Sequence, residues 1–541
     1  MVNVIFSKKY LFTLLGSKLD DKKLESYIAK MGFEMEGASA TEVTIELPAN
    51  RPDLVDIVGF SRALRNFLHK SKPADYGIKN PLPIFQIKVG KDIKEVRSFI
   101  SALVVEDIKF NEESLKHLLN FTEKFASNYG RSRKKIAIGL HDLDSITPPL
   151  GYDAIKDEEF YPLGSKKKMK FSEILKKHEK GVAYASAIGS SSLYPTLRDF
   201  VGTISLVPII NSERTKVTVK TKNLLIELTG TNRHSVEKSA DLFAAMFIDL
   251  GAKVRKVEVA YKDEKVLLPK MKQEKIEIPL LKIEGQIGVI IGFNNVISLA
   301  NKMGYRAGLV GRNIRFWIPQ YRLDILNEQD IIEDIAIAYG YDYIQPVPIF
   351  AEQIGELEAS TKRNMKISEI MVGMGFSEMM NSFLTSDNLN FEKMRQEKNV
   401  KGSIRVKAAK VQQLTMLRTS LLPSLLKNLG MSVHEKMPQK IFELDMAFNL
   451  GKSVEETQNV AALFTDPKAN FNQIKAIVEG LLQSMGMEYK VREILHSSFI
   501  EGRAASIILN GKSVGMFGEI HPEVLNNFGI EEPTVAFELA L

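Results

Sequence analysis

The chain has 541 residues, 44% of them hydrophobic and 26% charged, which is the ordinary balance of globular proteins and predicts about three to five domains at this length. Cysteine is absent, so disulfides, thiolate metal sites and cysteine nucleophiles are excluded and a reducing compartment is favoured. The net charge of +7 is compatible with a polyanionic partner such as RNA but does not by itself establish one.

The first residues, MVNVIFSKKYLFTLLG, carry Lys8 and Lys9 inside an apolar stretch, unlike a signal peptide. No apolar run approaches the ~20 residues that span a bilayer. We therefore expect no membrane association and a cytoplasmic location.

The amino-terminal region predicts a helix, a strand and a second helix. Leu24, Ile28 and Met31 recur at helical spacing before Gly32, which predicts a helix from residue 21. Apolar residues then alternate as in a strand: Val43, Ile45 and Leu47. After the proline-containing turn at 48–52, we expect another helix, capped by Asp53.

Two prolines, Pro81 and Pro83, predict a linker, after which strands alternate with turns around a helix near 112–130. This second domain contains two basic segments, GRSRKK at 130–135 and GSKKKMK at 164–170. Solvated loops are the favoured interpretation of both segments, and phosphate contact is the alternative.

A smaller unit follows, with a short helix and a strand that places Ile314, Phe316 and Ile318 on one face, as in small nucleic-acid-binding folds. The remaining chain predicts a helix near 361–374 and a mixed antiparallel sheet with flanking helices. The expected fold class is therefore α+β multidomain, with domains at 1–84, 85–270, 271–348 and 349–541.

Signatures that would identify an enzyme directly are missing, including a Walker loop and HExxH. His141 in GLHDLD is interpreted as a loop histidine satisfied by the backbone rather than as a catalytic base.

The segment YRLDILNEQDIIEDIAIAYGYD, residues 321–342, concentrates acidic side chains. Asn327 is a suitable N-cap, and the spacing places Asp330, Glu333 and Asp334 on one face of the following helix, opposite an isoleucine-rich face. Acidic side chains in the first turns stabilise a helix through its dipole, by about 0.3 to 1 kcal/mol each. Neighbouring acidic side chains nevertheless repel each other unless a cation lies among them. Arg322 and a hard divalent ion such as Mg²⁺ are both candidates, and spacing alone leaves the choice open.

Several segments together resemble one family, the β subunits of phenylalanine–tRNA ligase in their shorter archaeal and eukaryotic form. These segments are, in chain order, ELPANRPDL, GLHDLD, PIINSERTKV, ELTGTN, IPQYRLDI through IAYGYD, MLRTSLLPSLL, FEL at Phe442 and GEIHPEVL. They cover nearly the whole chain.

The resemblance implies an (αβ)₂ heterotetramer that attaches phenylalanine to tRNA(Phe), with ATP and phenylalanine bound by the α subunit. It also implies an amino-terminal module, a B3/B4-type editing domain, a winged-helix-like B5 module and a class II synthetase-like domain without activity. Near Phe442 and Phe537 the chain reads FELD and FELAL, where an active class II core would offer arginines for ATP phosphates.

The resemblance assigns two groups of site residues. Editing of mischarged Tyr-tRNA(Phe) is assigned to Ser205, Asn211, Glu227 and Thr229, and Mg²⁺ binding is assigned to Asp324, Asp330, Glu333 and Asp334. A second site is needed because a pocket for phenylalanine rejects tyrosine only weakly. On the alternative interpretation, Glu227 and Thr229 are outward positions of a strand whose Leu228 faces the core.

Two other functions remain as alternatives to a ligase subunit with editing activity. One is an RNA-binding scaffold subunit without editing activity, and the other is a hydrolase that acts alone on mischarged tRNA. The long segment after Ala351 disfavours the second, since a synthetase-like domain without ATP-binding arginines is better explained as an interface.

Overall fold

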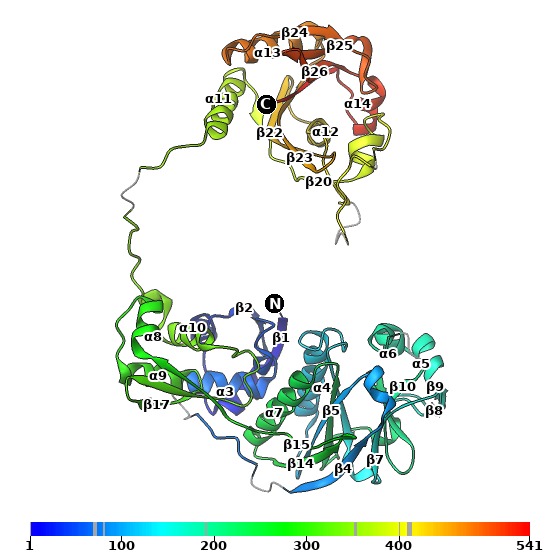
Figure 1. Ribbon diagram of the computed structural model, residues 1–541, viewed down its shortest axis with the longest axis vertical. Helices are drawn as coiled ribbons and strands as arrows, with labels where there is room; N and C mark the ends of the chain where they lie inside the picture. The colour runs from blue at the N-terminus through cyan, green and yellow to red at the C-terminus, as the bar shows by residue number, and fades with distance from the viewer. Residues whose placement is uncertain are drawn as a thin grey trace. The chain divides into compact units, whose positions relative to one another are not determined.

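The computed structural model describes residues 2–68, 73–78, 82–189, 192–350, 354–399, 401–407 and 414–541. The chain forms two compact units, Met1–Pro348 and Ile349–Leu541, whose helices and strands are drawn in Figure 1. The linker expected at Pro81 to Pro83 lies partly outside the described residues, and Pro83 itself begins a strand. None of the helices in these ranges combines the length and the apolar character needed to cross a membrane.

The amino-terminal region is a three-stranded antiparallel sheet, in the order β1-β3-β2, with three helices. Its elements are β1 (Val2–Ser7), α1 (Lys8–Leu15), α2 (Asp21–Lys30), β2 (Glu34–Ala38), β3 (Glu42–Leu47) and α3 (Ile57–Phe67). The predicted helix and strand are confirmed, because Leu24 and Ile28 of α2 share a buried core with Val43 and Ile45 of β3.

The start of α3 differs from the prediction. Asp53 lies in a 3-10 turn, η1 (Pro52–Leu54), and accepts two hydrogen bonds of 2.9 Å from Arg51. Asp56 instead caps α3, accepting hydrogen bonds from two backbone N–H groups of the first turn. The prediction of Asp53 as the cap is wrong because an arginine engages its carboxylate. Burial raises the pKa of Asp56 to about 7, even though those N–H groups act to lower it.

The next region is built around one sheet of ten strands. Their order is β12-β11-β10-β7-β4-β14-β5-β13-β6, with β15 added to β14. The strands are β4 (Pro83–Val89), β5 (Phe99–Glu106), β6 (Ile136–Asp142), β7 (Leu150–Ile155), β10 (Tyr194–Arg198), β11 (Thr203–Leu206), β12 (Ile210–Asn211), β13 (Leu224–Gly230), β14 (Lys253–Ala260) and β15 (Lys265–Leu268). The side chain of Asn211 on β12 donates to the carbonyl oxygen of Leu140 on β6 at 3.0 Å. The first and last strands of the order therefore lie side by side, so the sheet curls on itself.

Two helices, α4 (Glu112–Ser127) and α7 (Arg233–Asp249), cover one face of this sheet (Figure 1). Leu228 of β13 lies in the core on that face, together with Phe121 of α4, Phe243 of α7 and the apolar residues of the amino-terminal region. The other face carries a separate apolar cluster that includes Leu225 of β13. Strand β13 is therefore buried on both faces.

The third region of the first unit is a three-stranded sheet in the order β16-β18-β17. Its elements are β16 (Glu274–Pro279), α8 (Leu280–Ile287), α9 (Phe293–Lys302), β17 (Arg306–Val310), β18 (Asn313–Ile318) and α10 (Glu328–Tyr339). As predicted, Ile314, Phe316 and Ile318 are buried at alternate positions of β18. Ile331 and Ile335 of α10 pack into the same core.

The second unit is a seven-stranded sheet in the order β19-β22-β23-β27-β26-β25-β24, with helices on both faces. Its main elements are α11 (Ala359–Gly373), β19 (Ser377–Glu378), α12 (Leu422–Met431), β22 (Gln439–Leu450), β23 (Val454–Thr465), α13 (Phe471–Ser484), β24 (Lys490–Glu493), β25 (Phe499–Leu509), β26 (Lys512–Ile520), α14 (Pro522–Phe528) and β27 (Thr534–Ala540). The predicted helix near 361–374 and the mixed sheet with flanking helices are confirmed.

We expect the Asp56→Asn variant to lose a pH-dependent part of the stability of the first unit. Because the folded-state pKa of about 7 lies above the ordinary 3.8, the folded state binds the proton more tightly, and stability falls as pH rises between these values. The variant keeps a capping side chain but should lack this fall, which can reach a few kcal/mol at about 1.4 kcal/mol per pKa unit. Urea unfolding followed through the single tryptophan, Trp317, measures the difference, and parallel pH curves for the two proteins would contradict it.

Candidate functional site

The acidic stretch forms the start of α10, as expected. The side chain of Asn327 accepts a hydrogen bond from the N–H of Gln329 at 2.8 Å, and Asp330 accepts from the N–H groups of Leu326 and Asn327 at 2.7 and 2.9 Å. The predicted N-cap is confirmed. The carboxylate of Asp330 completes this capping box.

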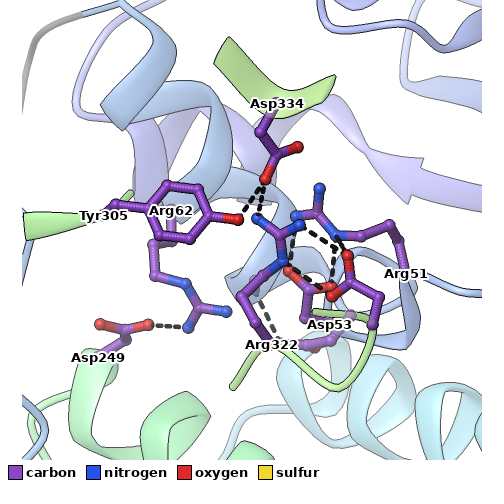
Figure 2. A network of polar contacts seen from close by, with 10 residues as sticks. Arg51, Asp53, Arg62, Asp249, Tyr305, Arg322 and Asp334 are labelled. Carbon is purple, nitrogen blue, oxygen red and sulfur yellow. Dashed lines mark hydrogen bonds and ion pairs between the residues drawn. The ribbon is translucent and has the colours of Figure 1, made fainter. Parts of the chain in front are cut away.

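Arg322 is the cation that lies among the acids (Figure 2). Its guanidinium donates to Asp324 at 2.8 and 2.6 Å and to Asp334 at 2.7 Å, and Asp334 also accepts from the hydroxyl of Tyr305. Burial alone would raise the pKa of Asp324, but Arg322 and Arg51 outweigh it and hold the pKa below its usual range. Arg322, one of the two candidate cations, thus pairs directly with two of the acids.

The four acids assigned to Mg²⁺ do not fit a metal ion as a set. Asp324 and Asp334 converge on Arg322, Asp330 caps the helix, and Glu333 is exposed while Asp334 is buried. Among the residues that the structure describes, no three His, Cys, Asp or Glu side chains are grouped so as to hold a metal ion. The expected common acidic face is therefore split between the interior and the solvent.

Arg322 belongs to a wider network of charges that joins three regions of the first unit (Figure 2). Arg51, which pairs with Asp53 in the amino-terminal region, approaches Asp324 to 4.0 Å. Arg62 of α3 pairs with Asp249 at the end of α7. The segments ELPANRPDL and IPQYRLDI, distant in sequence, thus meet at one buried site. Sequence reasoning missed this meeting because neither segment contains a local signal for the other.

The residues assigned to editing begin with Glu227 and Thr229 on β13. Their side chains are only 3% and 1% exposed. Glu227 pairs directly with Ala102 of β5, which belongs to the apolar cluster inside the curled sheet, and directly paired residues share a face. The interpretation of Glu227 and Thr229 as outward, solvent-facing positions is therefore wrong.

Glycine at 139 makes room for the Glu227 side chain. The two residues are partners across β6 and β13, and a Cβ at Gly139 would lie 2.3 Å from Glu227 Oε1 and 2.8 Å from its Cγ. The carboxylate therefore lies across the backbone of β6, which places it close to His141.

His141 joins this cluster although it was not predicted as a site residue. Its Nδ1 lies 2.9 Å from Thr215 Oγ1, and its Nε2 lies 3.8 Å from Glu227 Oε1. The expectation of a loop histidine satisfied by the backbone is wrong, because His141 is in β6 and its partner is a side chain. His141 Nε2 and Glu227 Oε2 are both buried without a hydrogen-bond partner, which is an arrangement suited to a polar ligand. His141 lies in GLHDLD, one of the segments that carry the family resemblance, and this segment could have identified it as a site residue.

Ser205 and Asn211 lie on the same interior face. Ser205 Oγ donates to Asn211 Oδ1 at 3.1 Å, and Ser205 pairs directly with Leu197 of β10, which belongs to the interior cluster. Because Asn211 is bonded to Leu140, the neighbour of His141, the closure of the sheet brings the four predicted editing residues to one interior.

Thr229 is held by a buried arginine. Arg97 donates from Nε to Thr229 Oγ1 at 3.0 Å and from Nη2 to the Thr229 carbonyl oxygen at 2.7 Å. Burial lowers the pKa of Arg97, and Tyr152 and Glu227 oppose that shift. An arginine nevertheless stays protonated in proteins, so Arg97 places a positive charge beside the Glu227 cluster.

In the second unit, the carboxylates of the two FEL segments have structural partners. Glu443 accepts from Arg418 at 2.6 Å, with both side chains 1% exposed, and from the backbone and side chain of Asn381. Glu538 accepts from Ser420, the N–H of Leu421 and the side chain of Asn459. These carboxylates therefore link the segment MLRTSLLPSLL to the central sheet.

We expect Arg322→Met to destabilise the first unit by about 3 to 5 kcal/mol, because two buried carboxylates would lose their cation. Arg322→Lys should fall between this variant and the wild type, since lysine keeps the charge but not the planar fork. Arg198→Met, which breaks a half-exposed pair with Glu158, is the matched control and should cost about 1 kcal/mol or less. Urea unfolding followed by Trp317 fluorescence compares them, and equal losses for Arg322→Met and Arg198→Met would contradict the central role of Arg322.

We also expect the acidic stretch of the purified chain to hold no stoichiometric Mg²⁺, because Arg322 already pairs with the carboxylates of Asp324 and Asp334. Elemental analysis should give the same metal content for the wild type and for an Asp330→Ala, Glu333→Ala double variant. An ion present in the wild type and lost from the double variant would overturn this expectation.

Comparisons with known protein families cover most of the chain. The family model described as "Phenylalanyl tRNA synthetase beta chain CLM domain" matches residues 345–541. The "tRNA synthetase B5 domain" matches residues 276–341 and the "B3/4 domain" matches residues 82–246. These matches agree with the predicted α+β multidomain fold class, with B3/4, B5 and synthetase-like parts.

Curated relatives match over the full length. The chain is 35% identical to the phenylalanine–tRNA ligase beta subunit of Methanocaldococcus jannaschii, covering 100% of both chains, and 34% identical to that of Archaeoglobus fulgidus, covering 98% and 96%. A crystal structure of an N-terminal fragment of the phenylalanyl-tRNA synthetase beta subunit from Pyrococcus horikoshii is 32% identical, with a TM-score of 0.60, and covers 63% of this chain and 100% of the fragment. The chain therefore belongs to the family of phenylalanine–tRNA ligase β subunits and is a subunit of an aminoacyl-tRNA ligase.

Proposed function

We propose that the chain works in the cytoplasm with a phenylalanine–tRNA ligase α subunit in an (αβ)₂ assembly that attaches phenylalanine to tRNA(Phe). ATP, with its Mg²⁺, and phenylalanine bind to the α subunit. Glu443 and Glu538 bind partners within the second unit, in segments where an active synthetase would need arginines for ATP. This supports a noncatalytic second unit. The surface of this unit then serves as an interface with α.

The proposed domains are 1–84, 85–270 for editing, 271–348 for the B5 module and 349–541 for the synthetase-like part. The separate sheets on either side of residue 270 support the boundary there, and the division of the chain after Pro348 supports the last one.

We propose further that the interior of the curled sheet hydrolyses mischarged Tyr-tRNA(Phe). The observation that carries this proposal is the unpaired, buried Glu227 Oε2 beside the unpaired His141 Nε2. A carboxylate can accept a hydrogen bond from a tyrosyl hydroxyl. Phenylalanine has no such hydroxyl and would leave the buried acceptor unpaired, so the site would bind the wrong amino acid and reject the correct one.

The other residues of the cluster have supporting roles in this proposal. Ser205 and Asn211 hold the closing strands together through their hydrogen bonds, and Arg97 fixes Thr229. His141 Nε2 is the group best placed to position a water molecule or the hydroxyl of the ligand. An RNA-binding scaffold without hydrolytic activity is the alternative function, favoured by the net charge of +7.

We expect Glu227→Gln in the αβ complex to reduce kcat/KM for deacylation of Tyr-tRNA(Phe) by about tenfold to a hundredfold, the range for a hydrogen bond to a charged group. Glu173→Gln, which changes a half-exposed glutamate of the same domain, is the matched control and should retain the wild-type rate. Aminoacylation with phenylalanine should be unchanged in both variants. If the wild-type complex does not deacylate Tyr-tRNA(Phe), the editing proposal fails and the scaffold alternative is favoured.

A further inference from the structure

An open hollow of about 1100 Å³ lies beside the end of β13 that leads away from Glu227. Its lining includes three cations, Arg131, Lys134 and Lys135, and one acid, Glu95. Within the part of the chain that the structure describes, none of these three cations takes part in an ion pair. The hollow therefore carries uncompensated positive charge.

The loop that supplies these cations has a fixed and unusual backbone. Arg131, Ser132 and Arg133 have φ values of 51°, 51° and 66°, in the left-handed region that residues other than glycine rarely adopt. Arg133 points inward and donates to the carbonyl oxygens of Pro208 and Ile209 at 3.1 and 2.8 Å. Arg131 and Lys134, on either side of it, are exposed. Such conformations persist where the surrounding structure holds them, often at functional sites.

The hollow is connected to the Glu227 cluster along β13. Thr231, which lines the hollow, follows Glu227 by four residues, or about 13 Å at roughly 3.3 Å per residue. Arg97 bridges the two, because it donates to Thr229 Oγ1 at 3.0 Å and to the Lys134 carbonyl oxygen at 3.4 Å. The hollow and the cluster therefore lie on one strand and share the contacts of Arg97.

We propose that this hollow binds the phosphodiester backbone of the single-stranded 3′ end of tRNA, so that the esterified amino acid reaches Glu227. The proposal rests on the editing function proposed above and adds the surface that presents the substrate. Unpaired cations around an open hollow suit phosphate groups, which position a nucleic acid without reading its sequence. GRSRKK is then a phosphate-contacting loop, and its solvated counterpart GSKKKMK is the natural control.

The test compares two double variants, each of which loses two positive charges. The first combines Arg131→Gln with Lys134→Gln. The second combines Lys166→Gln with Lys167→Gln, which changes two exposed lysines of the second basic loop. Binding of a short single-stranded RNA with the tRNA 3′-terminal sequence is measured by fluorescence anisotropy on the αβ complex. We expect the first double variant alone to bind about fivefold to tenfold more weakly, with a slope of log Kd against log salt that is shallower by about 1.4, since each single-strand phosphate contributes about 0.7. Its KM for deacylation should rise while kcat is retained, and its unfolding midpoint should match that of the control.

Equal weakening in both double variants, or weakening in neither, would overturn the proposal. Displacement of the RNA by ATP at concentrations far below those needed by inorganic phosphate would also overturn it, because the hollow would then be a mononucleotide site. If the wild-type complex binds the RNA through Arg131 and Lys134 but does not deacylate Tyr-tRNA(Phe), the editing function fails while the RNA surface stands.

Discussion

The guanidinium of Arg322, enclosed by Asp324 and Asp334, is the interaction on which the arrangement of the first unit depends. Removing these charges from water is costly, and only close, complementary geometry offsets that cost. The bidentate contact to Asp324 and the further bond to Asp334 provide such geometry. Because Arg51 adds a contact from the amino-terminal region, the same charges that hold α10 also hold a distant part of the chain. If the amino-terminal region and the region of α10 were displaced from each other, a buried charge would lose its partner. The charges therefore favour this arrangement of the two regions over others.

The constraint extends to the sheet that carries Glu227. Arg62 of α3 is paired with Asp249 at the carboxyl end of α7, and the amino end of α7 follows β13 after two residues. Helix α7 packs on one face of β13 through the shared core, and Glu227 lies on the other face. The position of the candidate editing residues is thus set by the packing of α7 and by an ion pair, both outside the curled sheet.

Local sequence patterns were sufficient to predict the helices and strands but not the contacts between distant segments. Asn327 and the isoleucines of α10 followed from capping and periodicity, since both depend on neighbours within a few residues. The approach of Arg51 to Asp324, the inward turn of Asp334 and the burial of Thr229 on a second covered face depend on contacts between distant segments. The family resemblance named Ser205, Asn211, Glu227 and Thr229, yet only the closure of β12 on β6 explains why these four share one interior.

Buried carboxylates in this chain divide into two kinds, and the division favours a ligand at Glu227. Both oxygens of Glu443 and both oxygens of Glu538 accept hydrogen bonds from side chains or backbone N–H groups, as expected for groups that stabilise a fold. Among the residues that the structure describes, Glu227 Oε2 is the only fully buried carboxylate oxygen without a partner. Its sequence neighbours are buried apolar residues, and although Arg97 places a positive charge nearby, no group in the protein hydrogen-bonds this oxygen. A buried carboxylate oxygen that no group in the protein hydrogen-bonds is best explained by a hydrogen bond that a substrate completes.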